Sequence, residues 1–243
     1  MKDLKLLFNY FHNKTFTKTV NNSPPGTEIE TIGNFAYLYT AILDAPLRDF
    51  VENGTVNIVK NEKTEEVIRL QNWNPLTICT TSSGDLLVIM EREDETKLVR
   101  YSGSTEKKSI QFDDKGKPLY LPGSLFKHIT ENRNRDICVA DNGFHAIVVV
   151  NMTGKLNFRF TGPTPSLKNN LLSPRGIIAD SQSHNLTAAY CNNCVYIIDQ
   201  GGQFLRYIEC GLSEPWGLCT DTNNNLFVAE YTNRQVKKIK YLQ

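Results

Sequence analysis

The sequence predicts an all-β fold, a β-propeller of five to six blades with four antiparallel strands each. An incomplete first blade is one of the two alternatives. Two observations predict this fold. Apolar residues fall in short runs rich in β-branched and aromatic side chains, and these runs recur in segments that align with one another every 40–50 residues or so. No stretch keeps the i, i+3, i+4, i+7 apolar spacing of a helix over three turns. Each segment therefore resembles one blade of short strands joined by tight turns.

Four of these segments align clearly. The C-terminal copy begins at Pro215-Trp-Gly, and 41 residues earlier Pro174-Arg-Gly begins another copy with the same order of apolar runs. In this motif proline fixes φ, and glycine allows the close backbone approach expected near the axis of a propeller. The whole chain, 1–243, is predicted to be a single propeller domain, with degenerate or partial blades in 1–54 and clear repeats at 72–116, 118–162, 172–212 and 214–243.

Within a repeat, the elements follow a fixed order of inner strand, polar turn, second strand, third strand and outer strand. The runs expected to form second and third strands are 86–90, 136–140, 146–150, 195–199 and 226–230. Residues 221–225, Asp-Thr-Asn-Asn-Asn, are typical of an Asx or left-handed turn. Cys79 and Cys219 occupy the same position in two copies, so we expect both thiols to be buried on inner strands.

The C-terminal repeat supplies only three strands after its proline, so its fourth strand has to come from elsewhere. Propellers commonly remove such an exposed edge by adding an N-terminal strand to the last blade. Residues 14–20 (Lys-Thr-Phe-Thr-Lys-Thr-Val) alternate well enough to serve. In that case the ring closes with five blades; if these residues instead complete a partial first blade, the ring has a gap.

The repeat pattern Pro-x-Gly-Leu/Ile-x-x-Asp…Leu-x-Val-Ala-Glu/Asp…Val-x-x-Ile resembles the NHL repeat. It is most similar to the NHL propellers at the C-terminus of tripartite-motif (TRIM-NHL) proteins, especially the expanded mollusc set, over about residues 55–243. The resemblance implies a non-catalytic recognition module that docks protein substrates or single-stranded RNA for a ubiquitin ligase. The RING finger, B-boxes and coiled coil of that family have no counterpart in this sequence, so we expect no ligase activity from this chain.

Charge and composition narrow the range of partners and locations. With 27 Lys+Arg against 26 Asp+Glu, the net charge of +1 argues against a globally basic nucleic-acid binder, and no DNA binding is expected. No apolar run approaches the ~20 residues of a membrane helix, so no membrane partner is expected. The N-terminal apolar run is shorter than the roughly 7–15 residues of a signal peptide, which favours a cytoplasmic location.

An enzymatic alternative is a propeller that holds a metal ion in its central channel. Such a site needs ligands from several blades, but His12, His128, His145 and His184 do not recur at one repeat position. Cys191 and Cys194 form a lone CxxC without the second pair of a structural zinc site. No Ser-His-Asp spacing, HExxH or phosphate loop is found. We therefore expect no enzyme activity, no metal and no cofactor.

In the NHL arrangement, the turns before the inner strands and those between second and third strands share one face. Cations there would neutralise phosphates, rings would stack on bases and amides would read base edges. The same side chains suit protein docking, so a pure protein-interaction propeller without an RNA role stays open. Lys127, Arg175 and Trp216 share one repeat position and are expected to present their side chains along one rim. The candidates for this ligand face are Lys127, Phe144, His145, Arg175, Tyr190, Asn192, Asn193, Trp216, Tyr231, Asn233 and Arg234.

Overall fold

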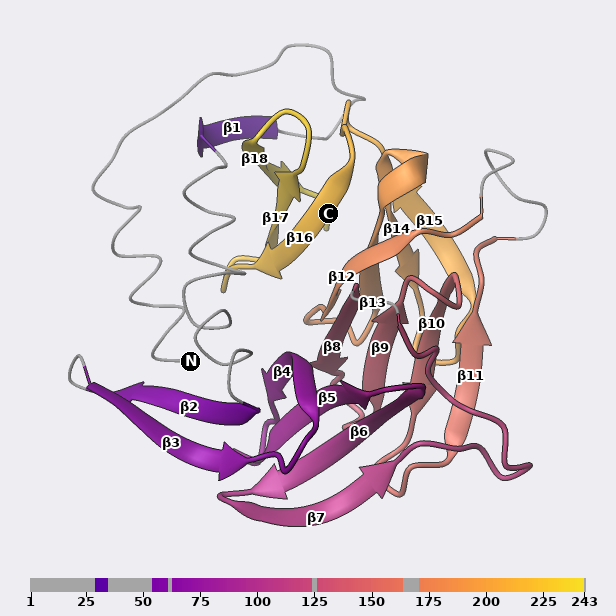
Figure 1. Ribbon diagram of the computed structural model, residues 1–243. Coiled ribbons are helices and arrows are strands. Elements are labelled where there is room, and N and C mark those ends of the chain that lie inside the picture. Colours follow the sequence, from indigo (N-terminus) through magenta and orange to yellow (C-terminus); the bar gives the residue numbers. More distant parts are fainter. Residues whose placement is uncertain (1–28, 35–53, 61–62, 124–125, 164–170, 243) are drawn as a thin grey trace.

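The computed structural model describes residues 29–34, 54–60, 63–123, 126–163 and 171–242, and its regular elements are β-strands apart from a 3-10 turn at Tyr190–Asn192 (Figure 1). The strands are β1 (Ile29–Asn34), β2 (Thr55–Lys60), β3 (Lys63–Arg69), β4 (Asn74–Thr80), β5 (Leu86–Arg92), β6 (Glu95–Ser102), β7 (Thr105–Ile110), β8 (Lys127–Glu131), β9 (Ile137–Asp141), β10 (Ala146–Val150), β11 (Leu156–Phe160), β12 (Pro174–Ala179), β13 (Asn185–Ala189), β14 (Cys194–Ile198), β15 (Phe204–Ile208), β16 (Pro215–Thr220), β17 (Asn225–Glu230) and β18 (Gln235–Lys240).

These strands form four four-stranded antiparallel sheets, β4–β7, β8–β11, β12–β15 and β16–β18 with β1. Each clear repeat of the sequence contains the consecutive strands of one sheet. The inner strands β4, β8, β12 and β16 lie beside one another in that order, and the sheets fan outward from them (Figure 1). The prediction of an all-β fold with four-stranded antiparallel sheets is therefore confirmed.

Within the described ranges, a fifth sheet consists of the two strands β2 and β3. Val56, Ile68 and Leu70 of this hairpin region and the nearby Trp73 pack against the sheet β4–β7, on side chains that include Met90. The hairpin thus sits where a preceding blade would lie, as strands covering one face of the first complete sheet. Most of the region predicted to hold degenerate or partial blades, 1–28 and 35–53, lies outside the described residues.

The last sheet is completed by β1, which pairs antiparallel with β18. The register places Ile29 opposite Ile239 and Glu30 opposite Lys238. A strand from early in the chain thus closes the last blade, as expected, but the choice of residues 14–20 for that position is wrong. Residues 29–34 occupy it instead, and residues 14–20 lie outside the described part of the chain.

The turns between inner and second strands share one hydrogen-bond scheme. In each of three sheets, a side-chain oxygen accepts hydrogen bonds from the backbone N–H groups two and four residues later. The acceptors are Asn132 (3.0 and 2.9 Å), Asp180 (2.8 and 2.8 Å) and Asp221 (2.9 and 2.8 Å). Within the turn at 221–225, Asn224 has a left-handed φ of 60°, so the predicted Asx turn is confirmed.

None of the six cysteines forms a disulfide. Cys79 and Cys219 lie on the inner strands β4 and β16 as predicted, but both are only half-buried, so the expectation of full burial is wrong. Second and third strands such as β9 and β10 are buried along their whole length between neighbouring sheets, whereas β16 is half-exposed from its third residue onward. Burial still raises the pKa of the Cys219 thiol to about 11.

Gly176 of the Pro-Arg-Gly motif lies on β12 directly against the backbone of β16. A Cβ atom there would approach the Trp216 carbonyl oxygen to 2.6 Å and the Leu218 nitrogen to 3.0 Å, both backbone atoms. Gly176→Ala is therefore expected to lower the free energy of unfolding by about 1–3 kcal/mol, measured by urea denaturation. Gly217→Ala is the matched control, since its nearest contact would be an ordinary 3.5 Å to Ala229 Cβ. Equal losses in the two variants would contradict a backbone clash at Gly176.

Candidate functional site

Four aromatic rings gather at one end of the inner strands, and three of them lie against the guanidinium of Arg175. Phe126 precedes β8, Tyr190 follows β13, Trp216 lies in β16 and Tyr231 follows β17. The Arg175 Cζ atom lies 4.4 Å from the Phe126 ring centroid, 4.6 Å from that of Trp216 and 5.0 Å from that of Tyr190. Trp216 also stacks on Tyr231 with centroids 5.1 Å apart. We call these five residues the aromatic cluster; it joins segments of three successive repeats.

The side chains expected to meet a ligand along the rim are buried. The exposed fraction is 2% for Lys127, 8% for Arg175 and 6% for Trp216. The expectation that these three side chains lie open to phosphates and bases is therefore wrong. Arg175 and Trp216 each follow the proline that begins their inner strand and are covered by rings from neighbouring segments. Lys127 differs, because it lies opposite Asp141 in the register, as Pro174 and Pro215 lie opposite Ala189 and Glu230. Asn192, another candidate, is also buried.

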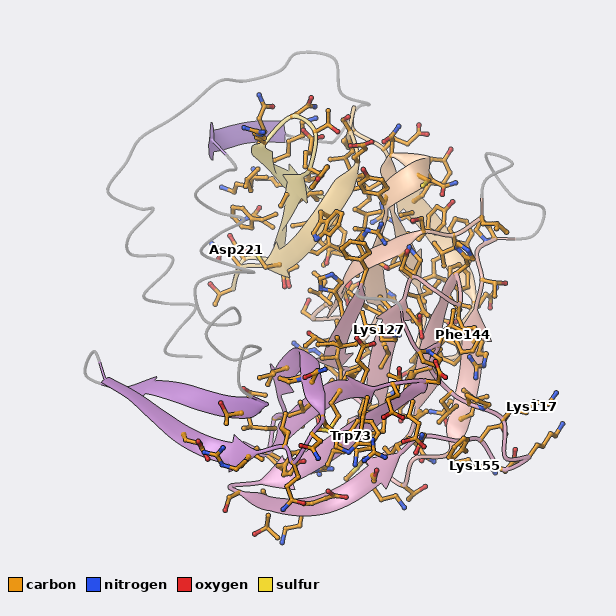
Figure 2. The ribbon with its side chains drawn as sticks, in the orientation of Figure 1. Trp73, Lys117, Lys127, Phe144, Lys155 and Asp221 are labelled. Atoms are coloured by element: carbon orange, nitrogen blue, oxygen red, sulfur yellow. The ribbon has the colours of Figure 1, made fainter. Side chains whose placement is uncertain are left out.

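Lys127 is the buried first residue of the inner strand β8 and lies near the centre of the view in Figure 2. Burial lowers the pKa of its ammonium group, while the nearby carboxylates of Asp141 and Glu91 oppose that shift. Asp141 itself is buried and accepts hydrogen bonds from the backbone of Leu121 (2.9 Å) and Phe144 (3.2 Å). Lys127 and Asp141 are therefore buried inside the propeller and support its structure, and they are not exposed to a ligand.

His128 follows Lys127 on β8, the inner strand on which the sequence predicted it. Burial, with a further contribution from the positive charge of Arg175, lowers the pKa of the imidazole to about 4. Among the described residues, no three His, Cys, Asp or Glu side chains gather closely enough to hold a metal ion. No helix in this described part of the chain has the length and apolar character needed to cross a membrane.

Other side chains of the same face are exposed. Tyr231 is 49% exposed, Phe126 42% and Leu171 70%. Among the predicted candidates His145, Asn193, Asn233 and Arg234 are also exposed, whereas Phe144 is half-buried with the Arg159 guanidinium 5.0 Å from its ring. The face therefore presents aromatic and apolar groups at its surface, supported from below by the buried part of the aromatic cluster.

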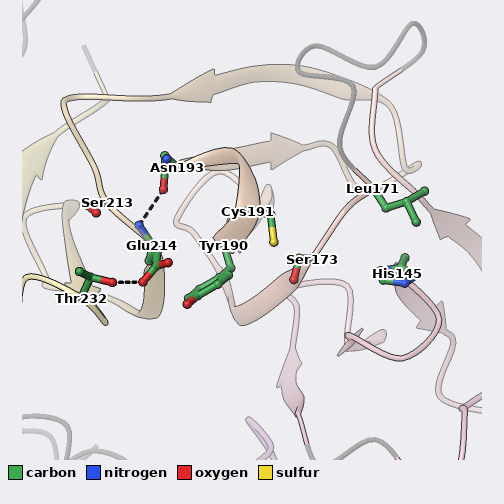
Figure 3. A pocket seen from close by; sticks show the side chains of 9 residues that line it. All are labelled: His145, Leu171, Ser173, Tyr190, Cys191, Asn193, Ser213, Glu214 and Thr232. Carbon is green, nitrogen blue, oxygen red and sulfur yellow. Dashed lines mark hydrogen bonds between the residues drawn. The ribbon is translucent and has the colours of Figure 1, made fainter.

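A cavity of about 650 Å³ opens beside the cluster (Figure 3). Three of the predicted candidates, His145, Tyr190 and Asn193, contribute to it. Its lining comes from three successive repeats: His145, Leu171, Ser173, Tyr190, Cys191, Asn193, Ser213, Glu214 and Thr232. We call it the rim pocket. The acidic residue of the lining, Glu214, is not among the predicted candidates.

Glu214 is held in place on one side of the rim pocket by three neighbours. Its backbone N–H donates to Asn193 Oδ1 (2.8 Å), and the Thr232 hydroxyl donates to its carboxylate (Figure 3). Burial, together with a hydrogen bond to the Glu214 carboxylate, raises the pKa of the Tyr190 phenol to about 12. Tyr190 and Thr232 thus hold the carboxylate as a positioned acceptor group.

The rim pocket forms at a repeat that lacks an acidic residue opposite the proline of its inner strand; the repeat of sheet β4–β7 also lacks one, with Met90 at that position. In the last sheet, Glu230 occupies that position and accepts a 2.7 Å hydrogen bond from the Ser213 N–H. Ala189 replaces it in the third sheet and has no side-chain acceptor, as the sequence indicated. The chain there continues into the 3-10 turn Tyr190–Asn192, which supplies pocket residues.

Sequence reasoning missed Phe126, Leu171 and Glu214. Phe126 and Glu214 each stand one residue before the inner strand of their repeat, so the alignment offered a signal for both. Leu171 lies in an irregular connection before β12, without repeat periodicity. Nothing in its local pattern marks it as a surface residue beside a pocket.

Radiating four-stranded antiparallel sheets with adjacent inner strands define a β-propeller. The chain is similar to regucalcin, a calcium-binding protein from Agrobacterium tumefaciens, with a TM-score of 0.56 and 9% identity over 90% of this chain and 75% of that one. It is also similar to the WD40 β-propeller domain of Doa1 (TM-score 0.55, 14% identity, 91% and 62% covered) and to virginiamycin B lyase from Staphylococcus aureus (0.51, 15%, 95% and 83%). At these identities the similarity concerns the fold alone.

In sequence, the chain is 30% identical over 93 residues to NHL repeat-containing protein 2 of Bos taurus, which is 38% of this chain and 12% of that protein. No protein-family model matches the chain. By its fold the chain is a β-propeller, and a part of it is similar in sequence to an NHL repeat-containing protein, of which the chain spans about an eighth. None of these comparisons links it to tripartite-motif proteins, so that finer resemblance stays a prediction.

Proposed function

We propose that this propeller is a non-catalytic recognition module that docks a protein partner on the face of the aromatic cluster. The observation that carries the proposal is the set of exposed side chains Phe126, Leu171 and Tyr231 on a buried, closely packed support. Aromatic anchors that lose little freedom on binding are typical hot spots of protein interfaces. In the arrangement of the tripartite-motif family, the docked protein would be a ligase substrate.

Protein docking is favoured over RNA binding because of where the cations lie. Single-stranded RNA needs basic side chains that reach its phosphates. Lys127 and Arg175 are buried, and the Arg175 guanidinium is surrounded by aromatic rings. The ligand-face candidates include three basic residues, and of these Arg234 is exposed. The face thus exposes more apolar side chains than basic side chains that could contact phosphates.

The test is selection of displayed peptides on the full chain, followed by binding measurements on two tyrosine variants. Tyr231→Ala is expected to weaken the selected peptides about tenfold or more, because it removes an exposed anchor on this face. Tyr207→Ala is the matched control: Tyr207 is similarly exposed, at 41%, but lies on the outer strand β15, and its loss should leave binding unchanged.

Both variants are first compared with the parent by circular dichroism to establish that they fold. Equal binding by parent and Tyr231→Ala would remove protein docking on this face. Saturable binding of single-stranded RNA that weakens steeply with salt and is lost in Arg234→Ala would replace the protein proposal with an RNA-binding one.

A further inference from the structure

The lining of the rim pocket has an uneven distribution of charge. Glu214 is the one acidic residue among its nine lining residues, and no Lys or Arg is among them. Within the residues that the structure describes, no ion pair within 4.0 Å is found for the Glu214 carboxylate. Arg175 does not line the pocket, and its guanidinium lies against three rings.

The hydrogen bonds around Glu214 leave room for a donor from a ligand. A carboxylate has about four lone-pair sites, and the Thr232 and Tyr190 hydroxyls use two of them. His145 adds to the acceptors of the lining: its Nδ1 lies 2.9 Å from the Leu172 carbonyl oxygen, so Nδ1 is the donor there and the neutral ring keeps Nε2 as an acceptor. The lining therefore favours ligands that donate hydrogen bonds.

Apolar groups flank these acceptors. The Tyr190 ring lies next to Glu214, and Leu171, 70% exposed, lies across the pocket near His145 (Figure 3). A cavity of about 650 Å³ accommodates a long side chain with adjoining backbone. A ligand with an apolar stem and a positively charged, donor-rich end would match both parts of this lining.

We propose that the rim pocket binds a cationic side chain of the docked protein, arginine in preference to lysine. The guanidinium donates to the Glu214 carboxylate, and the methylene stem packs against Tyr190 and Leu171. Arginine is preferred because its planar fork donates in several directions and packs on aromatic faces, whereas lysine offers a compact ammonium group. This assignment rests on the proposed function, because it names what the docked partner presents.

The experiment titrates the full chain with N-acetyl-arginine methylamide and with the citrulline counterpart, which has nearly the same shape and no charge. Binding is followed by NMR chemical shifts. The arginine probe is expected to bind the parent about tenfold or more tightly than the citrulline probe, because only the arginine probe makes a charge-assisted hydrogen bond. The lysine analogue is expected to fall between them. This comparison needs no variant, so it holds whatever a substitution does to folding.

Glu214→Gln then removes the charge while keeping the side-chain length and an acceptor for Thr232. It is expected to reduce arginine binding to the citrulline level and to leave citrulline binding unchanged. Glu93→Gln is the matched control, since Glu93 is exposed, has a left-handed φ of 51° close to the 47° of Glu214, and does not line the rim pocket.

Equal binding of the arginine and citrulline probes by the parent would overturn the cationic assignment, and so would unchanged arginine binding in Glu214→Gln. The outcome is separable from that of the docking test. If the arginine probe discriminates but Tyr231→Ala binds selected peptides normally, the pocket assignment stands and protein docking across the whole face fails.

Discussion

Replacing Trp216 with alanine is expected to lower the free energy of unfolding by about 3–5 kcal/mol. The indole is 6% exposed, stacks on Tyr231 and lies edge-on to Phe126 at 5.2 Å and to Tyr190 at 5.7 Å. Its removal leaves a cavity in the aromatic cluster and takes away one of the rings against which the Arg175 guanidinium lies. The measurement is urea denaturation followed by far-ultraviolet circular dichroism, which does not depend on tryptophan emission.

Phe112→Ala is the control for this prediction, because Phe112 is 50% exposed and its loss should change stability by no more than about 0.5–1 kcal/mol. Similar losses of unfolding free energy in the two variants would show that Trp216 stabilises the fold no more than an exposed ring does. The prediction also means that Trp216→Ala is a poor probe of ligand binding, since a loss of binding would follow from loss of structure.

Replacing Lys237 with methionine, as a separate single variant, is expected to lower the free energy of unfolding by about 3–5 kcal/mol. The Lys237 ammonium donates to Glu230 Oε1 at 2.9 Å and to the Gly211 carbonyl oxygen at 2.6 Å. The Glu230 side chain has no exposed surface. Methionine has a similar length but no charge, so it leaves a buried carboxylate without its cation. Thermal and urea denaturation measure the loss.

A double-mutant cycle separates this pair from general damage to β18. Adding Glu230→Gln to Lys237→Met removes the buried charge and is expected to recover part of the stability. Lys240→Met is the positional control, because Lys240 is exposed on the same strand. No recovery in the double variant, together with an equal loss in Lys240→Met, would contradict a role for the buried ion pair.

The strands and their grouping could be predicted from the sequence because each repeat carries its own local signals. Pro174 and Pro215 begin β12 and β16, and glycine follows two residues later in both strands. The close approach at Gly176 was predictable for the same reason: a residue without a side chain at a shared position indicates that another backbone comes near.

The closing strand could not be predicted in this way. Residues 29–34, Ile-Glu-Thr-Ile-Gly-Asn, belong to no repeat and have a weaker alternation than 14–20. They are defined as a strand by pairing with β18, a partner about 210 residues away in sequence. Local periodicity carries no information about which of two candidate segments reaches such a distant edge.

The burial of the rim residues escaped prediction for a different reason. The repeat alignment placed Arg175 and Trp216 at equivalent positions, each one residue after the proline of its inner strand, but equivalent positions have different neighbours. Phe126 from one repeat covers Arg175 of the next, and Tyr190 contacts Trp216 of the one after that. Such contacts between blades depend on the side chains that neighbouring repeats bring close in space. An alignment of repeat sequences does not contain that information.

The pairing of β1 with β18 also bears on the order in which the molecule can assemble during synthesis. Sheets such as β8–β11 and β12–β15 are each made from consecutive strands and can form as soon as their own residues have left the ribosome. The sheet β16–β18 with β1 cannot, because its edge strand β1 is made before β4–β15 and its other three strands after them. Contacts this distant in sequence form slowly. Until β18 has been synthesised, β1 therefore has no partner strand in this sheet, and the nascent chain carries it as an open edge that a chaperone or a second nascent chain can reach.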